Sequence, residues 1–70
     1  MQSGDFEELF MVNIFIVSDS HITRSGLRRI LETQTTVRVL GELSVKRATA
    51  EVILDHRPDV VLVDLDSHAL

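Results

Sequence analysis

Two apolar runs dominate the pattern of hydrophobic and polar positions along the chain. Residues 12–17 contain a single polar side chain, Asn13, and residues 60–63 contain none. Continuous runs of branched apolar residues are typical of strands that are covered on both faces of a sheet. Pro58 has no backbone donor and disfavours helix at the residue before it, so the second run begins a new element. We predict two neighbouring strands at the centre of a sheet.

The segments between these runs alternate between helical and extended patterns. After a turn in which Asp19 or Ser20 caps the helix, apolar residues recur at helical spacing on one face, namely Ile22, Leu27, Ile30 and Leu31. Gly26 costs about 1 kcal/mol against Ala inside a helix, which predicts a close approach of this helix to the sheet. Arg24, Arg28 and Glu32 are expected on the solvated outer face, with a weak Arg28–Glu32 pair.

A third strand and a second helix complete the pattern. Residues 37–40 are interrupted by Arg38, which indicates an edge strand that Gly41 and Glu42 end. Residues 44–57 form the second helix, with Ser44 as its cap and His56 in its last turn, exposed or facing the helix dipole. The inward side of this helix is expected to contain Thr49, Ala50, Val52 and Ile53.

Together these elements predict an α/β fold with the order βαβαβ. Each connection is long enough for a right-handed crossover, so the sheet is expected to be parallel. With the two most apolar strands as neighbours, the strand order is 2-1-3, and the helices cover opposite faces. Residues 12–70 make up this domain. Residues 1–11 are an N-terminal extension that can form a short helix capped by Asp5, and they can also be a loosely packed leader.

Composition narrows the range of functions. The chain has 70 residues, no Cys and a net charge of −4, with 44% hydrophobic residues. A domain of this size is marginally stable, and its acidic balance is unsuited to gripping a phosphate backbone. DNA contact is therefore expected only through a segment outside this sequence. No apolar run approaches the roughly 20 residues of a membrane span, and we expect a cytoplasmic protein without membrane contact.

Candidate chemistry lies where the central strands end. Asp19 follows the first strand, while Asp64 and Asp66 come at the end of the third. Parallel neighbours end at the same edge, where ligands bind in open α/β sheets. Hard carboxylate oxygens suit Mg²⁺, which takes one or two carboxylates and keeps several waters. From the residues alone, a structural role for Asp19 or Asp64 as turn former or helix cap stays open.

A family resemblance adds to this interpretation. The segment 12–21, the helix at 24–32, the residues 39–42 and above all the stretch 57–65, which reads Arg-Pro-Asp-Val-Val-Leu-Val-Asp-Leu, resemble the N-terminal half of a bacterial response-regulator receiver domain. The resemblance is to the class that precedes a LuxR-type helix-turn-helix. It implies a truncated flavodoxin-like fold and a role in two-component signal transduction in a transcription regulator. It further implies that Asp64 accepts a phosphoryl group from a histidine kinase, and that Asp19, Asp64 and the backbone carbonyl of Asp66 bind Mg²⁺.

The sequence also departs from the family pattern. Ser18 replaces the first of two acidic residues, and Ser67 and His68 stand where the family usually has Met-Pro. The sequence ends at Leu70, before the positions of the family's fourth and fifth strands. In the family the fourth strand carries a Ser or Thr that senses the phosphoryl group, and the fifth carries a Lys that pairs with it. We therefore expect that this chain is not an enzyme and that Asp64 alone accepts phosphoryl inefficiently.

Three functional hypotheses follow. In the first, the open edge of the third strand pairs with a second copy, so that a homo-oligomer forms. In the second, Asp64 is a working phosphoacceptor that a partner chain completes. The third is a small α/β nucleotide-binding or hydrolase fragment. Against it, neither a Gly-rich phosphate loop nor a nucleophile elbow follows the first strand, where the turn from Ser18 reads Ser-Asp-Ser-His.

Overall fold

The computed structural model describes residues 11–65. The expected short helix in the N-terminal extension, and the positions Asp66, Ser67 and His68, lie outside the described residues. Along the described part of the chain the elements follow as β1 (Val12–Ser18), α2 (His21–Glu32), β2 (Val37–Leu43), α3 (Ala50–His56) and β3 (Val60–Asp64). No helix in this part of the chain is both long and apolar enough to cross a membrane.

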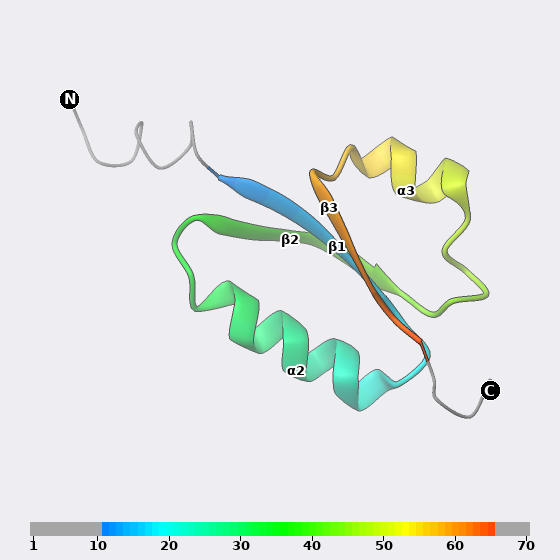
Figure 1. The fold of residues 1–70 in the computed structure, drawn as a ribbon, viewed down its shortest axis with the longest axis horizontal. Helices are drawn as coiled ribbons and strands as arrows, with labels where there is room; N and C mark the ends of the chain where they lie inside the picture. Colours follow the sequence, from blue (N-terminus) through cyan, green and yellow to red (C-terminus); the bar gives the residue numbers. More distant parts are fainter. Residues whose placement is uncertain (1–10, 66–70) are drawn as a thin grey trace.

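The three strands form one parallel sheet with the order β2-β1-β3, which confirms the predicted topology. The two helices lie on opposite sides of the strands (Figure 1). β1 is the central strand and the most deeply buried element, since residues 14–18 are all buried. Alternate β1 side chains point to opposite faces, so Ile14 and Ile16 face one helix layer while Phe15 faces the other.

The principal core lies between the sheet and α2. Ile14, Ile16 and Val39 form its buried centre, and Leu27 and Leu31 of α2 pack against them. The same helix carries two exposed isoleucines, because Ile22 is 83% and Ile30 65% exposed, so the prediction that both lie on the inward face is wrong. Gly26 also has no atom within 4 Å of where a Cβ would stand, which overturns the expected close approach to the sheet.

The close approach occurs instead at Gly41, in β2. A Cβ at this position would lie 3.0 Å from Cε2 of Phe15, which is almost completely buried. The register between β1 and β2 shifts between Ile14 and Phe15, and this irregularity sets Gly41 opposite the ring. β2 continues to Leu43, so Gly41 and Glu42 lie inside the strand. The prediction that these two residues end it is wrong.

The second helix is shorter than the pattern predicted. α3 begins at Ala50, with the Thr49 hydroxyl accepting a hydrogen bond from the Val52 backbone N–H, so Thr49 rather than Ser44 is its cap. Turns fill the preceding segment, in which Ala48 N–H donates to the Ser44 carbonyl. The predicted end before Pro58 is confirmed, since α3 stops at His56 and Arg57 adopts a left-handed conformation with φ 51°.

The third strand is more exposed than its sequence predicted. Among the side chains of β3 only Leu62 joins the principal core, whereas Val60, Val61 and Val63 are exposed. The expectation of a strand covered on both faces is therefore wrong for the described residues. Both the outer edge of β3 and part of its surface lack a neighbouring strand or helix within residues 11–65.

Candidate functional site

Ser18 and Asp64 lie side by side at the carboxyl edge of the sheet. They are register partners at the ends of β1 and β3, and the Ser18 hydroxyl donates to Oδ2 of Asp64 at 2.9 Å. The same Oγ accepts a hydrogen bond from the Ser20 backbone N–H at 3.2 Å. Ser18 is fully buried while the Asp64 side chain is exposed. Ser18 therefore fixes one oxygen of a carboxylate whose other oxygen receives no hydrogen bond from the described residues.

Asp19 lies at the same edge but has a different partner. Its Oδ1 accepts a hydrogen bond from the backbone N–H of Val45 at 2.9 Å, which ties the turn after β1 to the loop after β2. The helix cap is Ser20, whose hydroxyl accepts from the Thr23 N–H. Asp19 therefore has a structural role, as the alternative interpretation of the sequence allowed, and one carboxylate oxygen remains without a hydrogen bond within residues 11–65.

The donor set suits a hard cation only in part. The carboxylate oxygens of Asp19 and Asp64 that accept no hydrogen bond from residues 11–65 are the ligand type that Mg²⁺ prefers. The Ser18 hydroxyl, however, already donates its proton to Asp64. Among residues 11–65, no group of three or more His, Cys, Asp or Glu side chains is arranged to hold a metal ion. Asp66 lies beyond the described residues, so the magnesium site stays a prediction.

Arg24 is a residue of this edge that the sequence interpretation placed elsewhere. It was expected on the solvated face of the helix, yet its side chain is only 17% exposed. Its Nη1 donates to the backbone carbonyl of Ser18, and its Nε lies 3.7 Å from Oε1 of Glu42. Their positions in the sequence could have indicated this contact. Arg24 is in the first turn of α2, directly after β1, and Glu42 is near the carboxyl end of the neighbouring strand β2.

Arg28 extends this charge network along α2. Its Nε donates to Oε1 of Glu32 at 2.9 Å, which confirms the predicted pair, and its Nη1 donates to Oε2 of Glu42 at 3.2 Å. The hydrogen bond to Glu32, opposed by partial desolvation, raises the pKa of Arg28. Because an arginine pKa already lies far above neutral pH, Arg28 stays charged at any pH at which the protein folds. Glu42 is thus paired with two guanidinium groups.

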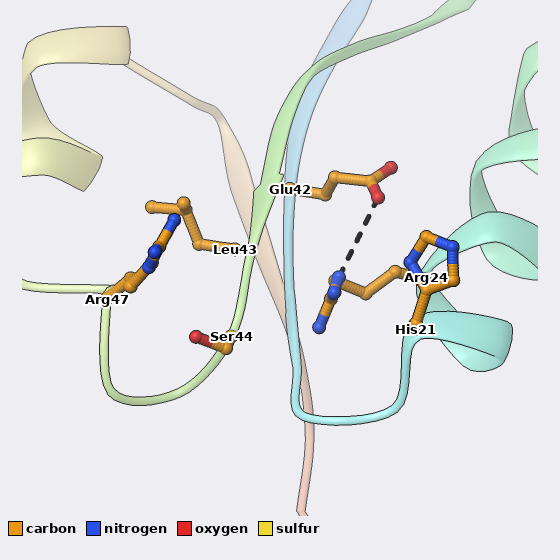
Figure 2. A pocket seen from close by; sticks show the side chains of 6 residues that line it. All are labelled: His21, Arg24, Glu42, Leu43, Ser44 and Arg47. Carbon is orange, nitrogen blue, oxygen red and sulfur yellow. Dashed lines mark ion pairs between the residues drawn. The ribbon is translucent and has the colours of Figure 1, made fainter.

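A pocket of about 300 Å³ opens beside this network. Its wall consists of side chains from the start of α2, the end of β2 and the following loop: His21, Arg24, Glu42, Leu43, Ser44 and Arg47. Figure 2 shows Glu42 directed toward Arg24, with Ser44 and Arg47 on the opposite side of the strands from His21. The sequence pattern contained no signal for this pocket, because its wall forms only when the start of α2 meets the end of β2 and the loop that follows.

The fold and its edge define a class of protein. A parallel β2-β1-β3 sheet with helices on both faces, and with Asp19 and Asp64 ending adjacent strands, has the architecture of the first half of a receiver-type α/β domain. Comparison with curated proteins agrees with this class. The chain is 39% identical over 54 residues to an uncharacterized transcriptional regulatory protein, YhcZ, of Bacillus subtilis, covering 77% of this chain and 25% of that protein.

Two further relatives are named as regulators. The response regulator UvrY of Escherichia coli is 36% identical over 55 residues, and the transcriptional regulatory protein LiaR of Bacillus subtilis is 33% identical over 55 residues. Both matches cover 79% of this chain, and 25% and 26% of the relatives. The chain thus spans about a quarter of the length of these proteins. It belongs to the response-regulator family and corresponds to the N-terminal half of a receiver domain. No family model matches the chain, and no solved structure matches it significantly.

Proposed function

We propose that this chain contributes to two-component signal transduction as a receiver segment of a transcription regulator, with Asp64 as the position that accepts phosphoryl. The observation that supports this role best is the placement of Asp64: its carboxylate is exposed at the end of β3, at the same edge as Asp19. The names of the relatives supply the biological context. A histidine kinase is the corresponding phosphoryl donor.

The proposed chemistry is attack of an Asp64 carboxylate oxygen on the donor phosphorus. One O–P bond forms while the bond between phosphorus and the donor breaks, which leaves an acyl phosphate on Asp64. Mg²⁺ held by Asp19, Asp64 and the Asp66 carbonyl would neutralise charge on the transferred group. The Arg24 guanidinium, which lies at the described edge, already contacts Ser18 and Glu42. We therefore propose that phosphotransfer to the 70-residue chain alone is slow.

Intact-mass measurement after incubation with acetyl phosphate and Mg²⁺ tests this assignment. We expect a small fraction of the chain to gain one phosphoryl group, Asp64→Asn to lose this adduct, and Asp55→Asn to retain it. Asp55 is a suitable control because it is an exposed aspartate on α3, away from the carboxyl edge. An adduct that persists in Asp64→Asn would reject Asp64 as the acceptor.

Substitution of Ser18 tests the role of the metal. Ser18→Asp introduces a second charge beside Asp64, which repels it unless a cation joins the two carboxylates. We expect this variant to be less stable than the parent chain without Mg²⁺, and to recover stability and form more adduct when Mg²⁺ is added. No effect of Mg²⁺ on either property would contradict a metal site here.

We also propose that the exposed strand β3 mediates self-association. Val60, Val61 and Val63 are exposed, and β3 has no outer neighbour within residues 11–65. An apolar edge of this kind favours pairing with a strand of another chain, which can be a second copy or a partner that completes the sheet. Light scattering after size-exclusion chromatography should detect a dimer that Val63→Lys dissociates. A compact monomer at micromolar concentration would refute self-association and favour a different partner chain.

A further inference from the structure

The face of β3 that points toward α2 is only partly covered. Val60 and Leu62 pair in register with the two core isoleucines of β1, so their side chains lie on the same face of the sheet as the principal core. Leu62 is half-buried against that core, but Val60 is 42% exposed. An apolar surface therefore continues from the core onto β3 and is open to solvent at Val60.

Ile30 of α2 borders this surface. Arg28 contacts Glu42 of β2, which identifies the flank of α2 that faces β2. Because a helix turns by about 100° per residue, Ile30 lies on the other side of the inward-facing Leu27 from Arg28. With the strand order β2-β1-β3, that second flank is directed toward β3. Ile30 is 65% exposed, and together with the two β3 side chains it makes up what we call the α2–β3 patch.

Residues 1–10 lead into the sheet beside this patch. The starts of β1 and β3 are tied together, since the Asn13 N–H donates to Oδ2 of Asp59 and the Asp59 N–H donates to the Asn13 carbonyl. Val60 follows directly, and its register partner lies three residues along β1 from the first described residue, a distance of about 10 Å. Ile30 is near the same edge, because it lies in the last turn of a helix that runs back toward the start of β1. Ten residues are therefore long enough to reach the patch.

The sequence of this segment matches the patch in hydrophobicity and in charge. Close to β1 it contains three large apolar side chains, Phe6, Leu9 and Phe10. The same ten residues include three acidic side chains and no basic one. Arg29, next to Ile30, is exposed and forms no ion pair within residues 11–65. An apolar and acidic segment is thus complementary to an apolar patch with a cation beside it.

We propose that residues 6–10 dock on the α2–β3 patch of the same chain, with their apolar side chains on Val60, Leu62 and Ile30. Covalent attachment keeps the segment at an effective concentration in the millimolar range, which favours it over the same segment of another chain. Docking here covers a face of β3 but not its outer edge, so it is compatible with the edge pairing proposed above. It is also independent of the role of Asp64, which lies at the opposite end of β3.

Nuclear Overhauser effects in the 70-residue chain, with ¹³C-labelled methyl groups, test this docking. We expect contacts from the ring protons of Phe6 and Phe10 to the methyl groups of Val60 and Ile30. In a 1:1 mixture of labelled and unlabelled chain, detection restricted to intermolecular effects should not show these contacts. Their presence there would mean that a second copy covers the patch, and would overturn docking within one chain.

Two exposed isoleucines of α2 provide a matched pair of variants. Ile30→Gln removes part of the patch and should eliminate most of the contacts between the phenylalanine rings and Val60. Ile22→Gln makes the same change about 12 Å away along the helix axis and should retain them. Both positions are exposed, so the amide spectra of residues 11–65 should show that each variant keeps the fold. Equal losses in the two variants, or no contact from residues 6–10 to the patch in the parent chain, would overturn the proposal.

Discussion

The two outer strands of the sheet are similarly apolar in sequence but differ in how they are covered. In β2, Val39 is 9% exposed and Arg38 is the sole exposed residue of the strand. In β3, Val63 is 54% exposed and Leu62 is the sole member of the strand that is half-buried. The more continuous apolar run thus belongs to the more exposed strand.

The difference follows from what lies over each strand. Leu27 and Leu31 of α2 close the core over β1 and β2, and Glu42 ties the end of β2 to Arg24 and Arg28 of that helix. Neither helix contains a fully buried residue, but only α2 packs half-buried side chains onto the principal core, while on the other face His56 of α3 packs against Phe15 at a ring-centroid separation of 5.0 Å. An apolar run therefore shows that a strand is suited to burial, while the element packed over it determines how far the strand is buried. We expect β1, β2 and α2 to contribute most of the free energy of unfolding, because the principal core lies between them.

Truncation of one side chain in each region tests this comparison most strongly. Ile16→Ala removes a completely buried side chain of β1, for which losses of about 2–5 kcal/mol are typical. Val63→Ala removes a half-exposed side chain of β3 and should cost under about 1 kcal/mol at protein concentrations too low for the proposed dimer to form. Urea unfolding followed by circular dichroism measures both free energies. Because so small a domain has only a few kcal/mol to lose, Ile16→Ala should be largely unfolded in buffer.

Comparable losses in the two variants would mean that β3 is covered in solution, either by the second copy proposed above or by residues outside 11–65. Repeating Val63→Ala at several protein concentrations separates these cases, since only association makes its cost depend on concentration.

The two glycines sharpen the comparison at the level of single atoms. Gly41→Ala places a methyl group 3.0 Å from the buried Phe15 ring, and the strain should cost about 1–3 kcal/mol. Gly26→Ala meets no atom within 4 Å in the middle of α2, so it should stabilise the protein by about 0.5–1 kcal/mol through helix propensity. Thermal unfolding of both variants against the parent chain should give shifts of opposite sign. Destabilisation by Gly26→Ala would show that α2 has a close neighbour at this position.

These glycines also show what the sequence could and could not predict. Alternation of apolar runs with helical spacing, and crossovers long enough for a parallel sheet, determined the order β2-β1-β3 correctly. The role of each glycine was assigned to the wrong position. The register shift between Ile14 and Phe15 sets Gly41 against the ring, and no local pattern encodes that shift.

The same limit applies to the carboxyl edge. Strand ends correctly place Asp19, in the turn after β1, and Asp64, at the end of β3, at the same edge of the sheet, because that placement follows from topology alone. The hydrogen bonds that occupy them depend on side-chain directions, so the contacts to Val45 and Ser18 could not be predicted. Arg24 was assigned to solvent because helix periodicity describes one helix and omits the neighbouring strand that supplies Glu42.

Ser18 is the buried polar link between the stable region and the exposed third strand. Ser18→Ala removes the hydrogen bond to Asp64 and the one accepted from Ser20, and should cost about 1–2 kcal/mol. Ser25→Ala provides a control of the same chemistry at an exposed position of α2, where the change should stay within about 0.5 kcal/mol. Hydrogen exchange locates the effect: amides of β3 should lose protection before those of β2. Equal loss in both strands would show that the sheet opens as one unit.

The charge network on α2 gives the smallest effect and tests whether β2 owes part of its cover to ion pairs. Glu42→Gln weakens two guanidinium contacts at a partly buried carboxylate and should cost about 1 kcal/mol. Glu32→Gln weakens one exposed i,i+4 pair and should cost about 0.3–0.5 kcal/mol. Added salt should shrink the Glu32 effect more, because screening acts most on exposed charges. Double-mutant cycles with Arg28→Met measure the coupling free energy of Arg28 to Glu32 and to Glu42. A coupling to Glu32 as large as that to Glu42 would show that the ion pair within α2 stabilises the protein as much as the contact with β2 does.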